Sequence, residues 1–188
     1  DGVIGQRMEK GVLPEQRPRL TNEEVMARCP WATFGKLKHR GPNIVTSLEL
    51  DPAEMEKRNI HLQQKYAEIE EKEVRYEEIH CDDAEYLIVA FGSCARIAQK
   101  AMEEARAEGI KVGLLRPITL WPFPSKAIAE RSRQVKGILT VELNAGQMVE
   151  DVRLAVECKV PVEYFGRLGG IVPDPDEVVT ALKEKIIK

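Results

Sequence analysis

Short apolar segments alternate with amphipathic ones in the second half of this chain, and this alternation restricts its fold more than any other feature. Four runs rich in β-branched and aliphatic residues lie at 86–91, 111–116, 137–142 and 160–165. They are mostly apolar throughout, which is typical of strands covered on both faces. Repeated strand–helix units with short connections require a mainly parallel sheet with right-handed crossovers. The sequence therefore predicts a three-layer α/β/α domain.

Helices are predicted between these strands and after the last one. Each of these segments carries apolar residues along one face, as a helix covering a sheet should. The last one begins at Asp174, which can cap the free N–H groups of the first turn together with Glu177. Its predicted buried stripe contains Val178, Val179, Leu182 and Ile186. The predicted helices are residues 94–108, 125–135, 147–157 and a C-terminal helix from 174 onward.

Residues 74–80 add one further strand to this sheet. Val74 and Tyr76 alternate with Arg75 and Glu77, a pattern of period two that predicts an edge strand. An antiparallel strand at the edge makes the sheet mixed. We therefore predict a mostly parallel, five-stranded sheet in an α/β domain that covers residues 74–188.

The first 73 residues have a different character. Residues 1–50 contain four prolines and no sustained period of 3.6 or 2, so they predict an irregular arm that gains order on another surface. A basic group at 36–40 is either solvated or meets an acidic partner. Asp51 and Pro52 then begin a connecting helix over residues 51–73, because Asp51 caps it and Pro52 needs no partner for its nitrogen.

Charge and cysteine spacing exclude several classes of protein. The net charge of −3 argues against a nucleic-acid binder, and no apolar run approaches the length needed to span a membrane. The four cysteines are scattered and form no C-x-x-C pair, so the sequence predicts no zinc site, iron–sulfur cluster or redox dithiol. Reduced thiols in a cytoplasmic protein are the expected state.

The carboxyl ends of the predicted strands are where an open α/β sheet binds ligands. Gly92 and Ser93 follow the first of these strands and precede a helix, so they form either a weak anion site or a tight turn with a capping serine. Glu142, Asn144 and Gln147 gather after the third strand. They either orient a ligand or a facing subunit, or satisfy the loop backbone and cap the next helix.

Two other segments leave alternatives open. Residues 80–83 form either a metal-binding site or a turn. The turn is favoured, because adjacent residues rarely bind the same ion. Residues 117–124 combine three prolines with Leu120, Trp121 and Phe123. This loop either folds back over the sheet or presents its aromatic groups at an interface, since a stiff loop loses little entropy on association.

Several motifs resemble the 2-oxoacid:ferredoxin oxidoreductase family. They are Phe91-Gly92-Ser93 and residues 115–124, 141–152 and 165–170, the last of which includes Arg167. The chain is similar to the alpha subunit of the 2-oxoisovalerate or 2-oxoglutarate type. The resemblance implies that the C-terminal ~105 residues form a transketolase C-terminal-like domain. It also implies that residues 1–50 join this domain to an upstream pyrimidine-binding domain.

The resemblance implies an enzyme that oxidatively decarboxylates a 2-oxoacid to an acyl-CoA, with ferredoxin as acceptor. Thiamine diphosphate with Mg²⁺ and iron–sulfur clusters belong to other parts of that assembly, because the G-D-G and N-N motif of the beta subunit does not occur here. No catalytic or metal residue is expected in this chain, which should be inactive alone.

In that case the chain assembles with beta, gamma and ferredoxin-like subunits and with a second copy of itself. The side chains expected at such interfaces are Trp121, Phe123, Glu142 and Arg167. Two alternatives remain: a stand-alone domain that binds a small anion or CoA near Gly92, Ser93, Asn144 and Gln147, and a protein–protein adaptor that uses the proline-rich loop.

Overall fold

The computed structural model describes residues 10–31, 41–44 and 46–187 of the chain. These residues divide into two compact units, one that ends at Gln63 and one that begins at Gln64. The predicted basic group at residues 36–40 lies outside the described residues. The unit after residue 64 contains the sheet.

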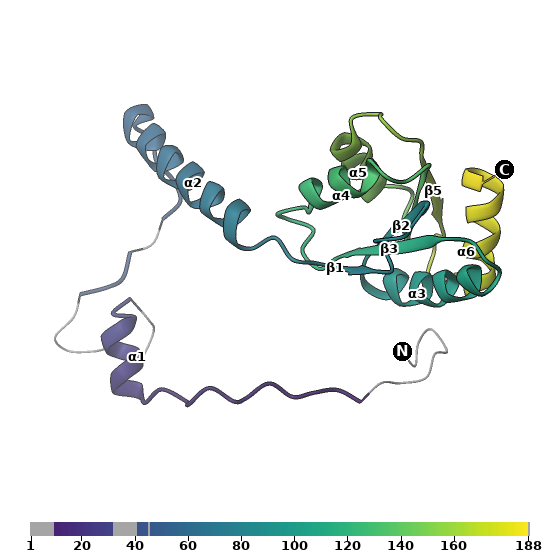
Figure 1. The fold of residues 1–188 in the computed structure, drawn as a ribbon. Helices are drawn as coiled ribbons and strands as arrows, with labels where there is room; N and C mark the ends of the chain where they lie inside the picture. The colour runs from purple at the N-terminus through teal and green to yellow at the C-terminus, as the bar shows by residue number, and fades with distance from the viewer. Residues whose placement is uncertain (1–9, 32–40, 45, 188) are drawn as a thin grey trace. The chain divides into compact units, whose positions relative to one another are not determined.

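Five strands form one mixed sheet in the order β1-β3-β2-β4-β5 (Figure 1). Strand β1 is antiparallel to β3, and the other neighbours are parallel. The three central strands are buried along almost their whole length. The predicted mixed five-stranded sheet is therefore confirmed. The strands are β1 (Tyr76–Ile79), β2 (Tyr86–Ala90), β3 (Val112–Pro117), β4 (Ile138–Glu142) and β5 (Val162–Gly166).

Helices cover both faces of this sheet (Figure 1). On one face α3 (Gly92–Ala107) and α6 (Pro175–Leu182) enclose a cluster that includes Ile88, Leu114 and Leu182. On the other face α4 (Ser125–Ser132) and α5 (Met148–Val156) enclose a second cluster that includes Leu87, Leu115 and Ile138. The chain then continues from α6 into a π-helical turn, η1 (Lys183–Ile187). The three-layer α/β/α prediction is confirmed.

The start of α3 differs from the prediction. This helix begins at Gly92 instead of Cys94, its N-cap residue is Phe91, and no side chain caps it. Gly92 has a φ of 56°, which turns strand directly into helix and places Ser93 inside the first turn. The prediction that Ser93 caps this helix is therefore wrong.

The unit before residue 64 also contains helical structure that the sequence interpretation missed. Helix α1 (Asn22–Arg28) begins at a capping box, in which the Thr21 hydroxyl accepts from the Glu24 N–H at 3.2 Å and the Glu24 carboxylate accepts from the Thr21 N–H at 2.8 Å. The expectation of a wholly irregular arm is wrong for these residues. No residue of α1 is buried.

The connecting helix α2 (Pro52–Lys72) runs across the boundary between the units. The Asp51 carboxylate accepts hydrogen bonds from the N–H groups of Ala53 at 2.8 Å and Glu54 at 3.3 Å, as predicted for its cap. Glu54 pairs with Lys57 at 2.6 Å. Within the described ranges, no helix has both the length and the apolar character that crossing a bilayer requires.

We expect trypsin to cut the arm well before it cuts the α/β unit. Arg19 and Arg28 are exposed in segments that bury almost nothing, so local opening there costs little free energy. In contrast, the half-buried Arg131 is paired with Glu78 at 2.5 Å and with Asp82 at 3.0 Å. Mass spectrometry of a digestion time course measures the order of cleavage. Cleavage after Arg131 before Arg19 or Arg28 would contradict this prediction.

Candidate functional site

The sheet has one topological switch point, between β2 and β4. Strand β2 is followed by α3 on one face, whereas β4 is followed by α5 on the other. Such a divergence opens a crevice beyond the carboxyl ends of the two strands. It places Gly92 and Ser93 after one strand, next to Glu142 and its loop after the other. The sheet therefore brings the two predicted groups of site residues to the same edge.

Glu142 is the central polar residue at this edge, and its side chain is fully buried. One carboxylate oxygen accepts hydrogen bonds from the N–H groups of Met148 at 2.8 Å and Gln147 at 3.2 Å. The other accepts from Val149 at 2.9 Å. A carboxylate at this position satisfies N–H groups that have no intrahelical acceptor and complements the positive end of the helix dipole. The geometry thus shows Glu142 capping α5.

The loop between Glu142 and α5 is held by similar contacts within the chain. The Asn144 side-chain oxygen accepts from the Gly146 N–H at 2.7 Å, and the Asn144 carbonyl accepts from the Tyr164 hydroxyl. Gln147 is the N-cap residue of α5, and its own side chain makes no cap bond. Gln147 and Ser93 are exposed. A ligand role for these residues therefore stays a prediction.

Burial beside Glu142 changes the acidity of two neighbouring groups. Burial raises the pKa of the Cys94 thiol to about 11, and the Glu142 carboxylate adds to this shift. Burial also raises the pKa of the Tyr164 hydroxyl, again with a contribution from Glu142. On the opposite face of the sheet, burial and then Glu78 raise the pKa of Cys81 to about 11. Both buried thiols therefore stay protonated at neutral pH.

We expect Cys81 and Cys94 to react slowly with a thiol reagent, whereas the exposed Cys158 reacts quickly. A pKa near 11 instead of 9.0 lowers the thiolate fraction at pH 8 about 100-fold, and burial blocks access as well. Folding raises these pKa values, so the unfolded chain loses its thiol protons at a lower pH than the folded chain. The free energy of unfolding should therefore fall as the pH rises from 9 toward 11. Timed labelling followed by peptide mapping measures the rates, with Cys158→Ser as the control. Equal rates at all cysteines in the folded chain would refute the prediction.

Arg167 is also engaged within the chain. Its guanidinium forms an ion pair with Glu177, whose other carboxylate oxygen accepts from the Asp174 N–H at 3.1 Å. Asp174 and Glu177 form the predicted capping box of α6. The Nε atom of Arg167 is buried without a hydrogen-bond partner among the described residues. Its contribution to an interface stays a prediction.

Residues 80–83 form a turn. The Cys81 thiol donates to the Leu114 carbonyl at 3.3 Å, while the Asp83 carboxylate binds Arg106 at 2.6 Å. These side chains therefore point to different partners. In the part of the chain that the structure describes, no three His, Cys, Asp or Glu side chains are grouped so that they could hold a metal ion.

The proline-rich loop folds back, and it also leaves aromatic surface exposed. The Thr119 hydroxyl accepts from the Arg75 N–H at 3.0 Å and donates to the Pro122 carbonyl at 2.9 Å. The ring of Trp121 packs edge-to-face with Tyr66 of α2, at 5.7 Å between centroids. Phe123 packs against a buried cluster, whereas 55% of Trp121 is exposed. The loop therefore folds back, as one of the two alternatives predicts, and an interface role for its exposed Trp121 stays a prediction.

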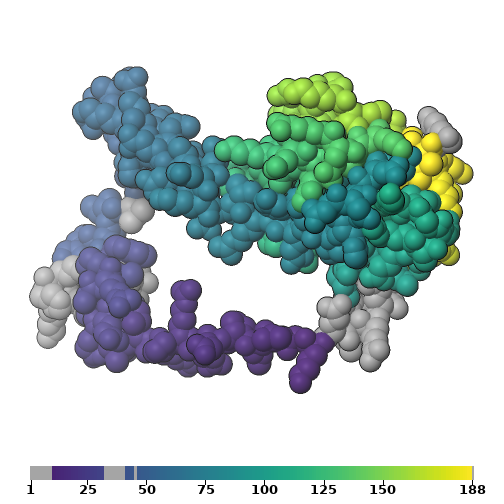
Figure 2. Space-filling view, viewed as in Figure 1, coloured from purple at the N-terminus to yellow at the C-terminus, as the bar shows by residue number. Residues whose placement is uncertain are grey.

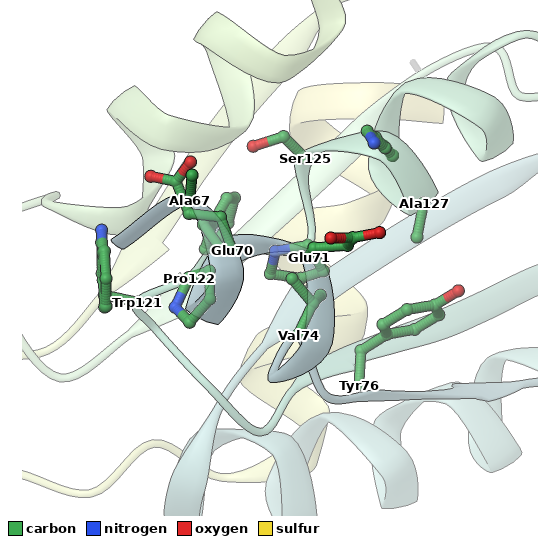
Figure 3. A pocket seen from close by; sticks show the side chains of 12 residues that line it. Ala67, Glu70, Glu71, Val74, Tyr76, Trp121, Pro122, Ser125 and Ala127 are labelled. Carbon is green, nitrogen blue, oxygen red and sulfur yellow. The ribbon is translucent and has the colours of Figure 1, made fainter. Parts of the chain in front are cut away.

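A hollow of about 730 Å³ lies between this loop, the end of α2 and the start of β1 (Figure 3). Sequence reasoning did not identify it, because its walls come from segments about 50 residues apart. We call it the α2–loop hollow. Its lining residues are Ala67, Glu70, Glu71, Val74, Tyr76 and residues 121–127.

Comparison with known sequences identifies the family of the α/β unit. The family described as pyruvate:ferredoxin oxidoreductase core domain II matches residues 84–178. The ketoisovalerate oxidoreductase subunit VorB of Methanothermobacter thermautotrophicus is 45% identical over 184 residues, which are 98% of this chain and 50% of that subunit. The chain thus spans about half the length of this relative.

Two solved structures share the fold. A 2-oxoglutarate:ferredoxin oxidoreductase from Magnetococcus marinus superposes with a TM-score of 0.63 and 24% identity, over 72% of this chain and 24% of that one. A split-gene transketolase superposes with a TM-score of 0.52 and 22% identity, over 58% of this chain and 40% of that one. The predicted transketolase-like fold is confirmed. With the sequence match over residues 84–178, the chain belongs to the pyruvate:ferredoxin oxidoreductase core domain II family.

Proposed function

We propose that this chain is a structural and assembly part of a 2-oxoacid:ferredoxin oxidoreductase subunit. The observation that carries the proposal is the use of Glu142, the only fully buried carboxylate among the described residues, to cap α5. At the switch point, where an open α/β sheet would bind a ligand, this carboxylate is committed to helix N–H groups. The edge is therefore built for rigidity, and the reacting groups would come from other segments.

The assembled enzyme would oxidatively decarboxylate a 2-oxoacid to an acyl-CoA and pass electrons to ferredoxin. The G-D-G and N-N motif that would bind its thiamine diphosphate and Mg²⁺ does not occur in this sequence, and the described residues contain no group of three His, Cys, Asp or Glu side chains that could hold a metal ion. Cys81 and Cys94 are buried on opposite faces of the sheet, so they cannot share a cluster. We therefore assign these groups to partner subunits.

A branched-chain 2-oxoacid is the substrate that we favour for the assembled enzyme. The named relative with 45% identity is a ketoisovalerate oxidoreductase subunit, whereas the 2-oxoglutarate enzyme of known structure is 24% identical. 2-Oxoglutarate is the second candidate. Comparing kcat/KM for the two 2-oxoacids with the enzyme purified from the native source would decide between them.

The proposed partners are a thiamine diphosphate-binding beta subunit, a gamma subunit, a ferredoxin-like subunit and a second copy of this chain, in the cytoplasm. Trp121 and Phe123 would contribute to these contacts, because the loop that carries them is both apolar and held rigid by Thr119.

Affinity purification from the native source tests this assignment. We expect mass spectrometry to identify a G-D-G-bearing subunit and a small ferredoxin-like subunit bound to the chain. The co-purified assembly should turn over a 2-oxoacid, whereas the isolated chain should not. Turnover by the isolated chain, or its micromolar binding of thiamine diphosphate in calorimetry, would contradict the proposal.

A further inference from the structure

The α2–loop hollow has walls suited to an extended peptide. Trp121 and Tyr76 stand at opposite ends of it, with the end of α2 between them (Figure 3). More than half of Trp121 and 42% of Tyr76 are exposed, and Pro122 and Pro124 form part of the lining. Aromatic-lined grooves of this kind bind proline-containing segments, whose extended conformation is already formed before binding.

The hollow also carries negative charge that is not neutralised by the described part of the chain. Acidic residues that flank its lining are paired: Glu68 with Lys72, Glu73 with Arg75, and Glu77 with Arg116. Glu70 and Glu71, which line the hollow, make no ion pair with any described residue.

Both carboxylates also belong to the last turn of α2, where the helix dipole disfavours negative charge. Lys126 supplies one positive charge to the same lining. A complementary ligand would therefore be cationic over most of its length and would carry one carboxylate.

The chain itself contains a segment with this chemistry. Residues 12–20 form neither helix nor strand and are exposed throughout, and Figure 2 shows them as part of a thin purple row of spheres. Arg17 and Arg19 make no ion pair with any described residue. Pro14 and Pro18 favour an extended backbone, and Glu15 supplies a single negative charge.

We propose that the α2–loop hollow binds residues 12–20 of a second copy of this chain. Arg17 and Arg19 would pair with Glu70 and Glu71, and one of the two guanidinium groups would also stack on an aromatic ring of the lining. Glu15 would pair with Lys126. The apolar side chains at both ends of residues 12–20 would be buried against the lining of the hollow. This inference rests on the proposed contact between two copies and names the surfaces that make it.

A peptide titration tests the hollow separately from the assembly. A labelled peptide with the sequence of residues 12–20 is titrated with the full chain carrying Arg17→Gln and Arg19→Gln. These two changes weaken competition for the hollow between residues 12–20 of the chain and the peptide. We expect saturable binding by fluorescence anisotropy. Glu70→Gln with Glu71→Gln should weaken it about tenfold, the scale expected for two exposed ion pairs. Trp121→Ala should weaken it at least as much.

Charge reversal and a matched control make the result specific. A peptide with both arginines changed to glutamate should bind the Glu70→Arg/Glu71→Arg chain and not the unreversed one. Glu56→Gln with Glu103→Gln, which removes two exposed helix carboxylates outside the hollow, should leave affinity unchanged. Peptide binding that is indifferent to the Glu70 and Glu71 changes, or no binding, would overturn the proposal.

Sedimentation of the full chain identifies the source of the segment. We expect a concentration-dependent dimer that Arg17→Gln/Arg19→Gln and Glu70→Gln/Glu71→Gln both weaken. The chain could instead stay monomeric while the Glu70→Gln/Glu71→Gln change still alters the environment of Trp121. Residues 12–20 of the same molecule would then occupy the hollow, and the proposal would be overturned. Neither failure alters the purification test of the enzyme assignment, which depends on other subunits.

Discussion

Replacing Glu142 with alanine is expected to lower the free energy of unfolding by about 3–5 kcal/mol. The carboxylate accepts hydrogen bonds from three backbone N–H groups at the start of α5, and its side chain is fully buried. Alanine leaves these donors without an acceptor, and the N–H groups of Met148 and Val149 are in buried positions. Urea unfolding followed by circular dichroism measures the change as a shift in midpoint at constant slope.

Two further variants separate the buried cap from the general effect of charge. Glu142→Gln keeps one acceptor oxygen but turns an NH₂ group toward the N–H donors, so we expect an intermediate loss. Glu150 is exposed in the first turn of the same helix, and Glu150→Ala should cost only about 0.3–1 kcal/mol through the helix dipole. If Glu142→Ala costs no more than Glu150→Ala, the capping role is wrong.

The sheet could be predicted because its strands are apolar on both faces. Residues such as Ile88 and Leu139 are fully buried, and the runs that contain them admit few other structures. The box at Asp174 likewise fixed the start of α6, because Asp and Glu at these positions satisfy N–H groups in their own neighbourhood. The similar box at Thr21 was missed, since the helix that follows it has only seven residues and is too short to show a helical period.

The site was only partly predictable, since its contacts join segments distant in sequence. Glu142 lies a few residues from the donors it caps, so its role was among the alternatives read from the sequence. The contact of Thr119 with Arg75 spans 44 residues and has no local signal. The α2–loop hollow depends on that contact and on the packing of Tyr66 against Trp121. Local patterns thus predicted the layers, while tertiary packing determined the loop surface.

The packing of α6 on α3 gives the second large expected effect. Leu182 is fully buried in the cluster between these helices, whereas Leu154, on α5, is 79% exposed. The same change of leucine to alanine can therefore be made at a buried and at an exposed helical position. The difference between the two variants measures the effect of burial, because both replace leucine with alanine within a helix and so change helix propensity equally.

Leu182→Ala is expected to lower the free energy of unfolding by about 2–5 kcal/mol, because it removes buried methyl groups and leaves a cavity that the neighbouring helices fill only in part. Leu154→Ala should change it by no more than about 0.5 kcal/mol. Urea unfolding of both variants at the same pH measures the difference. A Leu182→Ala loss as small as that of Leu154→Ala would mean that α6 does not pack on α3 in solution, and one layer of the proposed assembly domain would then be absent.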